Sequence, residues 1–581
     1  MTGQSQSAGE PPLPTGRRRS SAGEPPLPAG EARPSAGEAL SAADRRRSSA
    51  GEPPLCVGID IGTTAVKAVA VDEGGNVVRR ARLPSILSVG PGDRLEHDAG
   101  FTWWEAPRAA LSALARGLEA AGPRGSGGRE VAPELKAVAV SAMMPSIAPV
   151  DGRGKPLGAG LLYGSAGPAG PGDPTSSDEM ARLAVLSASD WPGAMGYWPA
   201  QGVANASLGG EGVIDLASAF AAGSLFNGSG WEEGASRAVG LSAAHLPRVV
   251  VWGEAVGELD LPGEEQERRR AQVVLGTGSV DGLCEQLVAG VSTPGDVLIT
   301  LGSTLVVWLC VPGWPKEVPP GLWRVPHLAG GMALVGGASN AGGLWADWAD
   351  RVLRPAGEES GAERGASSSG AGGWPGTSRV PTTRAGDGPG VGGVSRAGTR
   401  SPAGEDSQAG APSPFGRLSP ASVPVWWPWT RGERVPWHDA SLRVGLSGAH
   451  LSHGPAHLRR AVFEATGFVV RHIVGLASAC GTAPRRYVVT GGGVMNKEWL
   501  RALCEVLGAP VLPMAVPEGA ALGAAFLARM AAGLETSLSD AGRWSRWAAP
   551  VEPRPEWAEA AGERYERWAE GLPARGPACG P

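Results

Sequence analysis

One short pattern occurs twice in this chain, and the distance between its two copies constrains the fold more than any other feature. The first copy is IDIGTT, which starts at residue 59, and the second is ITLGST, which starts 240 residues later at residue 299. Each copy reads as an apolar strand, a glycine, two hydroxyl residues and a second strand. A repeat at this spacing predicts a duplicated fold with one such hairpin in each half.

The tip of the first hairpin carries groups that are suited to binding phosphate. Gly62 is predicted to make a tight bend through backbone angles that other residues avoid. Thr63 and Thr64 follow it and offer hydroxyls and backbone N–H groups. Asp60 lies two residues before the glycine, where a carboxylate would hold a hydrated Mg²⁺.

The tip of the second hairpin has the same order of groups in Gly302, Ser303 and Thr304. Two such tips that face each other across a cleft would hold a triphosphate between them. The alternative is a pair of ordinary hairpins whose hydroxyls only satisfy their own turns.

A third glycine-rich segment, VVTGGGVMNKEWL, joins a predicted strand to a helix that is expected to start near Asn496. Gly491, Gly492 and Gly493 would let a flat ring or a phosphate approach the backbone, and the start of a helix favours anions. A simple strand-to-helix turn stays open as the alternative.

The segment GTGSVDGLCEQL places Asp281 at the start of a predicted helix, directly after a Gly/Ser turn. A structural role as the helix N-cap or first-turn acid is worth about 1 kcal/mol. The functional role is that of a general base, because a sugar hydroxyl is a poor nucleophile until its proton is removed. A γ-phosphoryl group would then be transferred in line to the acceptor.

Composition divides the chain into segments. Gly (90) and Pro (52) make up nearly a quarter of the 581 residues, which indicates long unstructured stretches. Repeats of SAGEPPLP predict a disordered low-complexity arm over 1–55. Alternating strand-like and helix-like segments predict two domains over 56–257 and 270–530, the second with a disordered insertion over 355–420, followed by a Trp- and Arg-rich tail over 531–581.

Charge and cysteine content narrow the function classes. Lys plus Arg is 52 against 57 Asp plus Glu, so the net charge of −5 gives no sign of nucleic acid or an anionic membrane as partner. The sequence contains no run of 18 apolar residues, so no membrane span is expected. The start of the chain also lacks the apolar stretch that is typical of a secretory signal. The six cysteines show no CxxC spacing and lie mostly in apolar runs, which predicts reduced, buried thiols and a cytoplasmic location.

Taken in order, these elements resemble the FGGY family of carbohydrate kinases, and xylulokinases most closely. GIDIGTTAVKAV, which contains Lys67, is similar to the family's first phosphate motif, and TLGSTLV resembles the second. GTGSVDGLCEQLVAG is similar to the segment of the catalytic aspartate, which maps onto Asp281. VTGGGVMNKEWLRALCEVLGAPV resembles the adenosine motif. GERVPWHDASLRVGLSGAHLSHGPAHLRRAVFEA is similar to the second family signature, in which Val444 and Ala449 are unusual.

The resemblance implies an α/β fold with two duplicated actin-like (ribonuclease-H-like) domains and an interdomain cleft for ATP and Mg²⁺. It implies Asp281 as catalytic base and Asp60 as metal ligand, and hinge closure that excludes water. The expected cofactor-binding residues are Gly62, Thr63, Thr64, Lys67, Gly302, Ser303, Thr304, Gly491, Gly492, Gly493 and Asn496. The expected partner is a small-molecule sugar or polyol, without nucleic acid or membrane, and a homodimer is left open.

The acceptor pocket departs from this resemblance. Xylulokinases usually carry Gln-Met-His-Gly after the AVAVS strand, where this chain has Met143, Met144, Pro145 and Ser146. They also tend to carry an Asp and an Arg after LLYG, and neither follows here. Because such pockets discriminate through their polar groups, Met143 and Met144 are expected to line an altered pocket together with Asp281.

Asp98 and Trp104 lie where the family often has an acid and a tryptophan before its first helix. For Trp104, core packing is favoured over stacking on a sugar.

The sequence therefore predicts an ATP-dependent kinase that acts on a primary hydroxyl of a ketose or polyol, with D-xylulose as the first candidate. A kinase for ribulose, gluconate, glycerol or erythritol is the nearest alternative. A catalytically silent nucleotide-binding protein is the rival from another class, although it would have no need of the base Asp281. Actin-like assembly is disfavoured because the adenosine and Asp281 segments both resemble a kinase.

Overall fold

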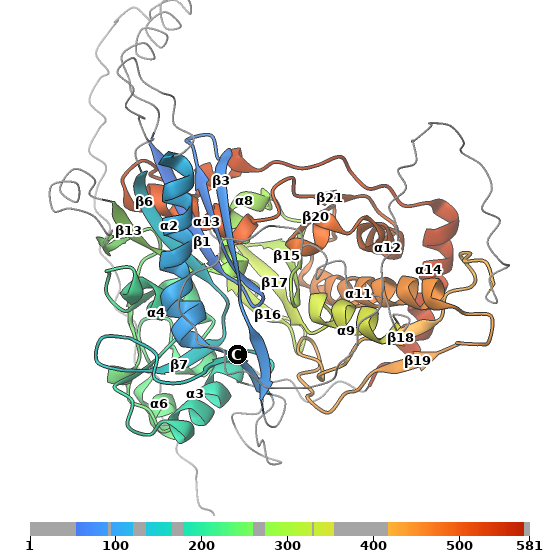
Figure 1. The fold of residues 1–581 in the computed structure, drawn as a ribbon. Helices are drawn as coiled ribbons and strands as arrows, with labels where there is room; N and C mark the ends of the chain where they lie inside the picture. The colour runs from blue at the N-terminus through green and yellow to red at the C-terminus, as the bar shows by residue number, and fades with distance from the viewer. Residues whose placement is uncertain are drawn as a thin grey trace, which may run out of the picture. The chain divides into compact units, whose positions relative to one another are not determined.

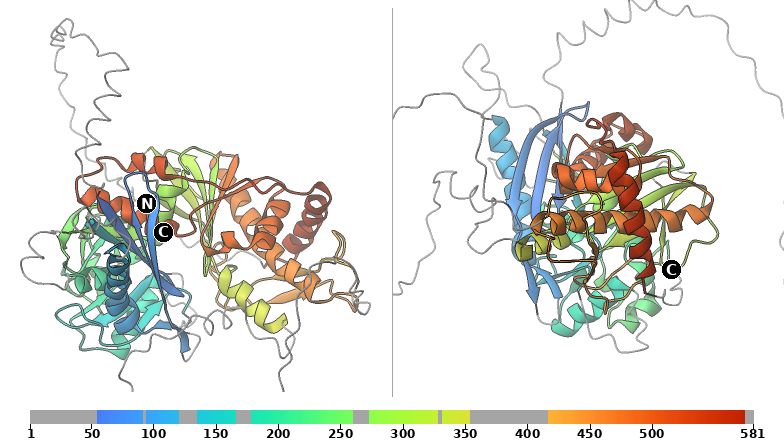
Figure 2. Two further views of the ribbon diagram at one scale, coloured as in Figure 1. Left: turned by 45° about the horizontal axis from the view of Figure 1, so that its top comes forward. Right: turned by 90° about the vertical axis from the view of Figure 1, so that its right-hand side faces the viewer.

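The computed structural model describes residues 54–90, 94–119, 135–165, 178–259, 273–327, 331–353 and 416–573 (Figures 1 and 2). The predicted arm over 1–55 lies outside these residues apart from its last two positions. The predicted insertion over 355–420 lies outside them apart from its last five.

The first half of the described chain is built on a mixed sheet in the order β12-β13-β6-β1-β2-β3. Its strands are β12 (Ala255–Glu258), β13 (Val274–Val280), β6 (Leu135–Ala142), β1 (Leu55–Ile61), β2 (Ala65–Val71) and β3 (Val77–Pro84). β1 pairs antiparallel with β2 and parallel with β6. Every residue of β1 is buried, as a continuous apolar run predicts for a strand covered on both faces.

The second half is built on a sheet in the order β16-β17-β15-β14-β20-β21. Its strands are β16 (Trp323–Pro326), β17 (Met332–Ser339), β15 (Leu305–Pro312), β14 (Asp296–Leu301), β20 (Arg486–Thr490) and β21 (Val511–Pro513). β14 pairs antiparallel with β15 and parallel with β20. β15 in turn pairs antiparallel with β17, as β2 does with β3.

The two sheets therefore repeat one arrangement, in which the β1–β2 and β14–β15 hairpins occupy equivalent places. This confirms the duplicated α/β architecture. The limit drawn between the predicted domains needs one correction. The second domain was expected to begin at 270, but β13 pairs with β6 in the first sheet. The chain leaves the first sheet only after β13.

Two helices connect the sheets: α8 (Asp281–Ala289) and α13 (Gly519–Ala531). α13 comes late in the sequence yet packs on β1, β6 and β13 of the first sheet (Figure 1). Its backbone is so close that a Cβ added to Gly58 would lie 1.8 Å from the carbonyl oxygen of Ala521. α8 packs against α13 and against strands of both sheets.

Other helices cover the remaining faces. α2 (Ala106–Glu119) packs on β1, β2 and β3, and α11 (Pro455–Ala477) packs on β15 and β17. The further helices are η1 (Gly100–Glu105), α3 (Glu179–Asp190), α4 (Ala200–Ser207), α5 (Leu216–Phe220), η2 (Gly223–Leu225), α6 (Glu233–Ala238), η3 (Ala243–His245), α9 (Gly343–Leu353), η4 (Ser478–Cys480), η5 (Gly492–Met495), α12 (Lys497–Leu507), η6 (Leu538–Trp544) and α14 (Pro555–Glu570).

The first half also contains a smaller antiparallel sheet, ordered β4-β5-β8-β7-β9, and α3 packs against its strands β7, β8 and β9. Its strands are β4 (Leu87–Gly90), β5 (Arg94–His97), β8 (Gly160–Leu162), β7 (Ser146–Val150) and β9 (Gly196–Trp198). Two strand pairs complete the described sheets: β10 (Val213–Asp215) with β11 (Arg248–Val250), and β18 (Val425–Trp427) with β19 (Gly445–Ser447).

The predicted tail is packed against the second half as far as it is described. Trp557 and Trp568 of α14 are buried in the core of that half. Arg564, also in α14, is 1% exposed and pairs with Glu464 of α11 at 2.6 Å. The buried pair fastens α14 to the central helix of the second half.

Among the described residues, one helical stretch is long and apolar enough to cross a membrane, Pro455–Cys480. It consists of α11 and η4, and 72% of its apolar window is buried inside the protein. The stretch is therefore a core helix of the second half. The five cysteines within the described residues are all free thiols, which agrees with the predicted reduced state, and Cys579 lies outside them.

Candidate active site

The first bend, Gly62–Thr64, is held by side chains from outside the hairpin. The Gly62 N–H donates to the carbonyl of Ala65 at 3.1 Å. The Thr63 hydroxyl lies 2.7 Å from the hydroxyl of Tyr163, and the Thr63 carbonyl accepts from Nε2 of His97 at 2.7 Å. Thr63 is buried, whereas Thr64 is exposed.

The reason given above for Gly62 needs correction. Gly62 is not among the glycines with positive φ, and neither is Gly302. A Cβ at Gly62 would instead lie 3.2 Å from the carbonyl oxygen of Ala65, and a Cβ at Gly302 would lie 3.3 Å from that of Thr304. Close backbone approach, rather than a left-handed conformation, therefore favours glycine at both bends.

Asp60 lies at the end of β1, directly opposite Lys67 of β2 in the hairpin register. The Lys67 ammonium donates to Oδ2 of Asp60 at 3.1 Å, and the side chain of Asp60 is 7% exposed. The charge of Asp60 raises the pKa of Lys67, against the opposing effect of burial. The two residues thus form an ion pair near the end of the β1–β2 hairpin.

Asp281 follows a bulge in β13. The register with β6 shifts between Gly276 and Ser279, and Gly278 has φ +74° with its Cα against the backbone of Val140. A side chain at Gly278 would collide with that backbone, so glycine is required there. The bulge delivers Asp281 to the first turn of α8, where its Oδ1 accepts from the N–H of Gly282 at 2.8 Å.

Burial raises the pKa of Asp281 to about 7, and the negative charge of Asp60 acts in the same direction. The two carboxylates, which come from β1 and α8, are therefore close enough to repel each other. Lys67 and Arg434 partly offset that repulsion.

Glu285 is a further titratable group in this place, and the motif analysis did not single it out. It lies one turn after Asp281 on α8, a spacing of four residues that places both on one helix face. Its Oε2 accepts from the hydroxyl of Thr300 at 2.5 Å. Burial raises the pKa of Glu285 to about 8, with Asp281 and Asp60 acting in the same direction. The i, i+4 spacing could have revealed it.

The second bend, Gly302–Thr304, is held mainly by backbone. The N–H of Gly343 donates to the Gly302 carbonyl at 2.8 Å, and the N–H of Leu344 donates to the Ser303 carbonyl at 3.0 Å. Both donors belong to the first turn of α9. Burial raises the pKa of the Tyr163 phenol, and the side chain of Thr304 acts weakly in the opposite direction.

The predicted adenosine segment lies beside the second bend. Gly491 has φ +86°, and a Cβ on it would lie 2.7 Å from the carbonyl oxygen of Leu301. A Cβ on Gly493 would meet the Leu301 side chain at 2.5 Å, whereas Gly492 faces open space. The amide oxygen of Asn496 caps α12 by accepting from two backbone N–H groups at 3.1 Å. Asn496 thus has a structural role whether or not it contacts a nucleotide.

The residues predicted for the acceptor pocket lie in apolar surroundings. Met143 and Met144 belong to two hydrophobic clusters and are 1% and 9% exposed. The Ser165 hydroxyl, on the segment after LLYG, donates to the carbonyl of Leu162 at 2.6 Å. These side chains offer no free polar group to a sugar, and their place in the pocket stays a prediction.

The two residues before the first helix have structural contacts. Trp104 is half-buried and packs against the core of the first half, in line with the favoured packing role. The Asp98 carboxylate accepts from the N–H of Phe101 at 3.0 Å, at the start of η1.

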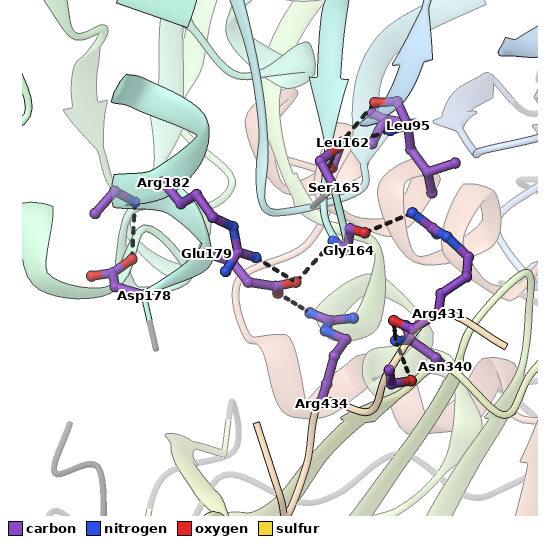
Figure 3. Close-up of polar contacts among 12 residues, drawn as sticks. Leu95, Leu162, Gly164, Ser165, Asp178, Glu179, Arg182, Asn340, Arg431 and Arg434 are labelled. Carbon is purple, nitrogen blue, oxygen red and sulfur yellow. Dashed lines mark hydrogen bonds and ion pairs between the residues drawn. The ribbon is translucent and has the colours of Figure 1, made fainter. Parts of the chain in front are cut away.

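Contacts between the two halves supply polar groups that local sequence does not reveal. The guanidinium of Arg434 donates to Glu179 of α3 at 2.6 Å, and that of Arg431 donates to the Gly164 carbonyl at 2.6 Å (Figure 3). Glu179 and Arg434 are 255 residues apart in the sequence. Pairs this distant leave no local pattern.

The residues present fit a hydrated Mg²⁺. The described residues hold no group of three or more His, Cys, Asp or Glu arranged around one metal position. Mg²⁺ at phosphate-transfer sites is typically held by one or two carboxylates, with water and phosphate as the remaining ligands. The mutual repulsion of Asp60 and Asp281 is the electrostatic setting in which a divalent cation is favoured.

Comparison with known proteins shows what the chain is similar to. The C-terminal domain of the FGGY family of carbohydrate kinases matches residues 320–532. The match covers 213 of the 581 residues, so it shows the likeness to this family for the second half of the chain.

Three relatives show how far the likeness extends. The xylulose kinase of Escherichia coli (strain K12) is 34% identical over 120 residues, which is 20% of this chain and 25% of that protein. The xylulose kinase from Rhodospirillum rubrum has a crystal structure with TM-score 0.62 and 21% identity, covering 89% of this chain and 98% of that one. The glycerol kinase of Plasmodium falciparum, solved with ADP, has TM-score 0.60 and 14% identity over similar shares, 89% and 98%.

The aligned sequence spans about a quarter of the curated relative, whereas the structural match spans nearly all of each FGGY kinase. At these identities the structural match shows the fold. The FGGY resemblance and the α/β fold with two actin-like halves are therefore confirmed for this chain.

Proposed function

We propose that this chain is an ATP-dependent kinase of the FGGY family that phosphorylates a primary hydroxyl of a ketose or polyol, with D-xylulose to D-xylulose 5-phosphate as the first candidate reaction. The observation that carries the proposal is the carboxylate of Asp281 in the first turn of α8, whose pKa is raised to about 7 by burial and by the charge of Asp60. A base with a pKa near the working pH combines a useful ionised fraction with a strong tendency to accept a proton.

In the proposed reaction the acceptor hydroxyl gives its proton to the Asp281 carboxylate. Its oxygen forms a bond to the γ-phosphorus while the bond from that phosphorus to the β–γ bridging oxygen breaks, so ADP leaves. Thr63, Thr304 and the backbone N–H groups of the two bends would bind phosphate oxygens. Lys67 would orient Asp60, which would hold Mg²⁺ through water. The metal, when bound, would neutralise charge on the phosphates.

Three observations support ATP as the donor. The two hairpins that carry the bends occupy equivalent places in the two sheets. The glycine segment at 491–493 lies against the end of β14, directly before the second bend. ADP accompanies the glycerol kinase of the same fold. A cytoplasmic location and a small-molecule acceptor follow as parts of the proposal.

The altered pocket favours two alternatives. The first alternative is an acceptor other than D-xylulose, because Met143 and Met144 are buried in apolar clusters. A silent nucleotide-binding protein is the other. The position of Asp281 counts against the second, because binding alone needs no base.

The experiment is a measurement of ADP release by the full chain with Mg²⁺ and ATP, across D-xylulose, D-ribulose, glycerol, erythritol and gluconate. At least one acceptor is expected to raise the rate at least tenfold above the acceptor-free rate. Asp281→Ala is expected to remove that increase, by about 10³-fold or more, and to leave binding of ATP within about threefold.

Glu498→Ala is the matched control, because Glu498 is also a first-turn helix acid but is exposed. It should retain full turnover. Normal turnover by Asp281→Ala would overturn the role of the base. Binding of ATP without any acceptor-dependent ADP release across the panel would favour the silent protein.

A further inference from the structure

Arg431 and Arg434 of the second half contact Gly164 and Tyr163 of the first half. Arg434 lies with its guanidinium carbon 5.1 Å from the ring centre of Tyr163, and Arg431 donates to the carbonyl of Gly164. Figure 3 shows Arg431 and Arg434 approaching the Gly164 turn and Glu179 from the opposite side of the site. Tyr163 and Gly164 follow β8, so the contact is made at the end of a strand.

Glu179 ties this contact to α3. Its Oε1 accepts from the N–H of Gly164 at 2.8 Å, and its Oε2 accepts from Arg434 at 2.6 Å. Burial acts to raise the pKa of Glu179, but the positive charges of Arg434 and Arg182 outweigh it and lower that pKa. Glu179 is therefore a charged group at neutral pH, and its carboxylate is bonded on both oxygens.

The Glu179–Arg434 pair is shielded from water. The two side chains are 15% and 8% exposed, against 44% and 73% for Glu233 and Arg237, which pair on the surface of α6. Exposed pairs such as Glu233–Arg237 contribute little to the free energy of unfolding, because water screens their charges. Removing one partner of a shielded pair leaves an uncompensated charge and costs much more.

Arg434 is itself fixed to the second sheet. The carboxylate of Glu433, its neighbour, accepts from the hydroxyl of Ser339 at 2.8 Å and from the N–H of Asn340 at 2.9 Å. The amide of Asn340 donates to the carbonyl of Gly432 at 3.1 Å. Ser339 ends β17, which pairs with β15 of the second hairpin. The segment 431–434 is thus a continuation of the framework that carries the second bend.

Tyr163 is the point at which this framework meets the first bend. Its hydroxyl lies 2.7 Å from that of Thr63, and the residue is 6% exposed. Arg434 contacts the ring of Tyr163 and does not contact either threonine in the hydrogen bonds described. Its contact with the ring of Tyr163 is therefore the route that the described contacts provide from Arg434 to the first bend.

We propose that Arg434 is a positioning residue for the nucleotide: paired with Glu179 and packed on Tyr163, it fixes the Tyr163 hydroxyl against Thr63 and so holds the first bend in place relative to the second half before any acceptor binds. The inference rests on the proposed function in one respect, namely that the two bends bind the triphosphate. It assigns a role to residues that lie outside all of the phosphate, adenosine and base motifs.

The test measures the affinity of the full chain for Mg²⁺ with the ATP analogue AMP-PNP by calorimetry, without acceptor. Arg434→Met is expected to weaken binding about tenfold, and Glu179→Gln about fivefold, since Gln keeps the bond from Gly164 but loses the charge. Arg434→Lys should recover part of the loss. Glu233→Gln, in the exposed pair on α6, should bind like the parent protein.

The decisive measurement is a double-mutant cycle with Tyr163→Phe, which keeps the ring and removes the hydroxyl. If Arg434 acts through that hydroxyl, the double variant binds no more weakly than Arg434→Met alone. Additive losses would overturn the proposal, as would unchanged affinity in both Arg434→Met and Glu179→Gln. Melting temperatures of all variants separate these outcomes from loss of the fold.

A purely structural role would lower the melting temperature of Arg434→Met and give no coupling to Tyr163 in the affinity. The cycle needs no acceptor and no turnover. Failure of the proposed kinase activity would therefore leave it interpretable, and failure of the cycle would leave the Asp281 test unaffected.

Discussion

The two bends share a sequence pattern and a place in their sheets, yet they are held in different ways. The first is fixed by side chains, since Thr63 contacts both Tyr163 and His97. The second is fixed by backbone N–H groups from the first turn of α9. Duplication has thus preserved the hairpin and changed its surroundings.

His97 illustrates how completely the first bend is enclosed. Trp103 donates from its indole N–H to Nδ1 of His97 at 3.1 Å, so Nδ1 is the acceptor and Nε2 carries the proton given to the Thr63 carbonyl. Burial lowers the pKa of His97, which keeps the ring neutral. Trp103, His97 and Thr63 are thus linked by buried hydrogen bonds that order the first bend. Among the hydrogen bonds described, the second bend has no equivalent series.

The bends also differ two residues before the glycine. The first has Asp60 there, and the second has Thr300, which donates to Glu285. Both side chains lie next to the same face of α8, Asp60 near Asp281 and Thr300 near Glu285. Under the proposed function, the first bend would serve metal binding and proton transfer, and the second would serve the nucleotide.

The largest expected effect comes from exchanging the acid of the first bend for its amide. Asp60→Asn is expected to lower kcat about 100-fold and to raise the Mg²⁺ concentration needed for half-maximal rate, because a neutral amide is a poor ligand for a hydrated divalent cation. The measurement is the initial rate of ADP release against Mg²⁺ concentration, with the best acceptor of the panel.

Thr300→Val is the matched variant at the second bend and should lower kcat less than about fivefold. Equal losses at the two positions, or an unchanged Mg²⁺ requirement in Asp60→Asn, would mean that the bends do not divide metal and nucleotide between them.

A smaller effect is expected from the hydroxyls. Thr63→Val keeps the shape of the side chain but leaves the buried phenol of Tyr163 without its 2.7 Å partner. An unpaired buried hydroxyl costs roughly 2 kcal/mol in the free energy of unfolding, whereas the less buried Thr304 should cost about 0.5 kcal/mol when changed to Val. Urea denaturation followed by tryptophan fluorescence measures both.

Thr64→Val serves as the control for this pair, since Thr64 is exposed and should change stability very little. A larger loss for Thr304→Val than for Thr63→Val would reverse the comparison and make the second bend the more firmly held.

Local patterns predicted the parts of this molecule that local chemistry determines. The hairpins at Gly62 and Gly302, the helix start at Asp281 and the turn at 491–493 all lie where the sequence indicated. Each depends on apolar alternation, glycine or a helix start within a few residues.

Contacts between residues that lie far apart in the sequence were not predicted. Tyr163 meets Thr63 from 100 residues away, and Glu179 meets Arg434 from 255 residues away. A single sequence carries no periodic signal for such pairs. The conformational reason given for Gly62 was wrong for a related cause, since its need for glycine comes from a nearby carbonyl and not from its own φ.

The smallest expected effect concerns pH and compares the two acids of α8. Burial raises the pKa of Asp281 from 3.8 to about 7 and that of Glu285 from 4.5 to about 8. Because both values are higher in the folded protein than in the unfolded chain, the folded state binds more protons in these windows. Its stability is then greatest at low pH and falls as pH rises towards the folded values.

In metal-free buffer, Asp281→Asn should therefore remove about 1–2 kcal/mol of the decline in unfolding free energy between pH 5 and pH 7. Glu285→Gln should remove a decline of about 1 kcal/mol that continues to pH 8, since its carboxyl titrates later. The change in unfolding free energy between pH 7 and pH 8 thus reports on Glu285 and the second bend. The change below pH 7 reports mainly on Asp281 and the first bend. Stability that rises with pH in the unmodified protein, or identical profiles for the two variants, would show that the environments of these acids do not differ as the two bends do.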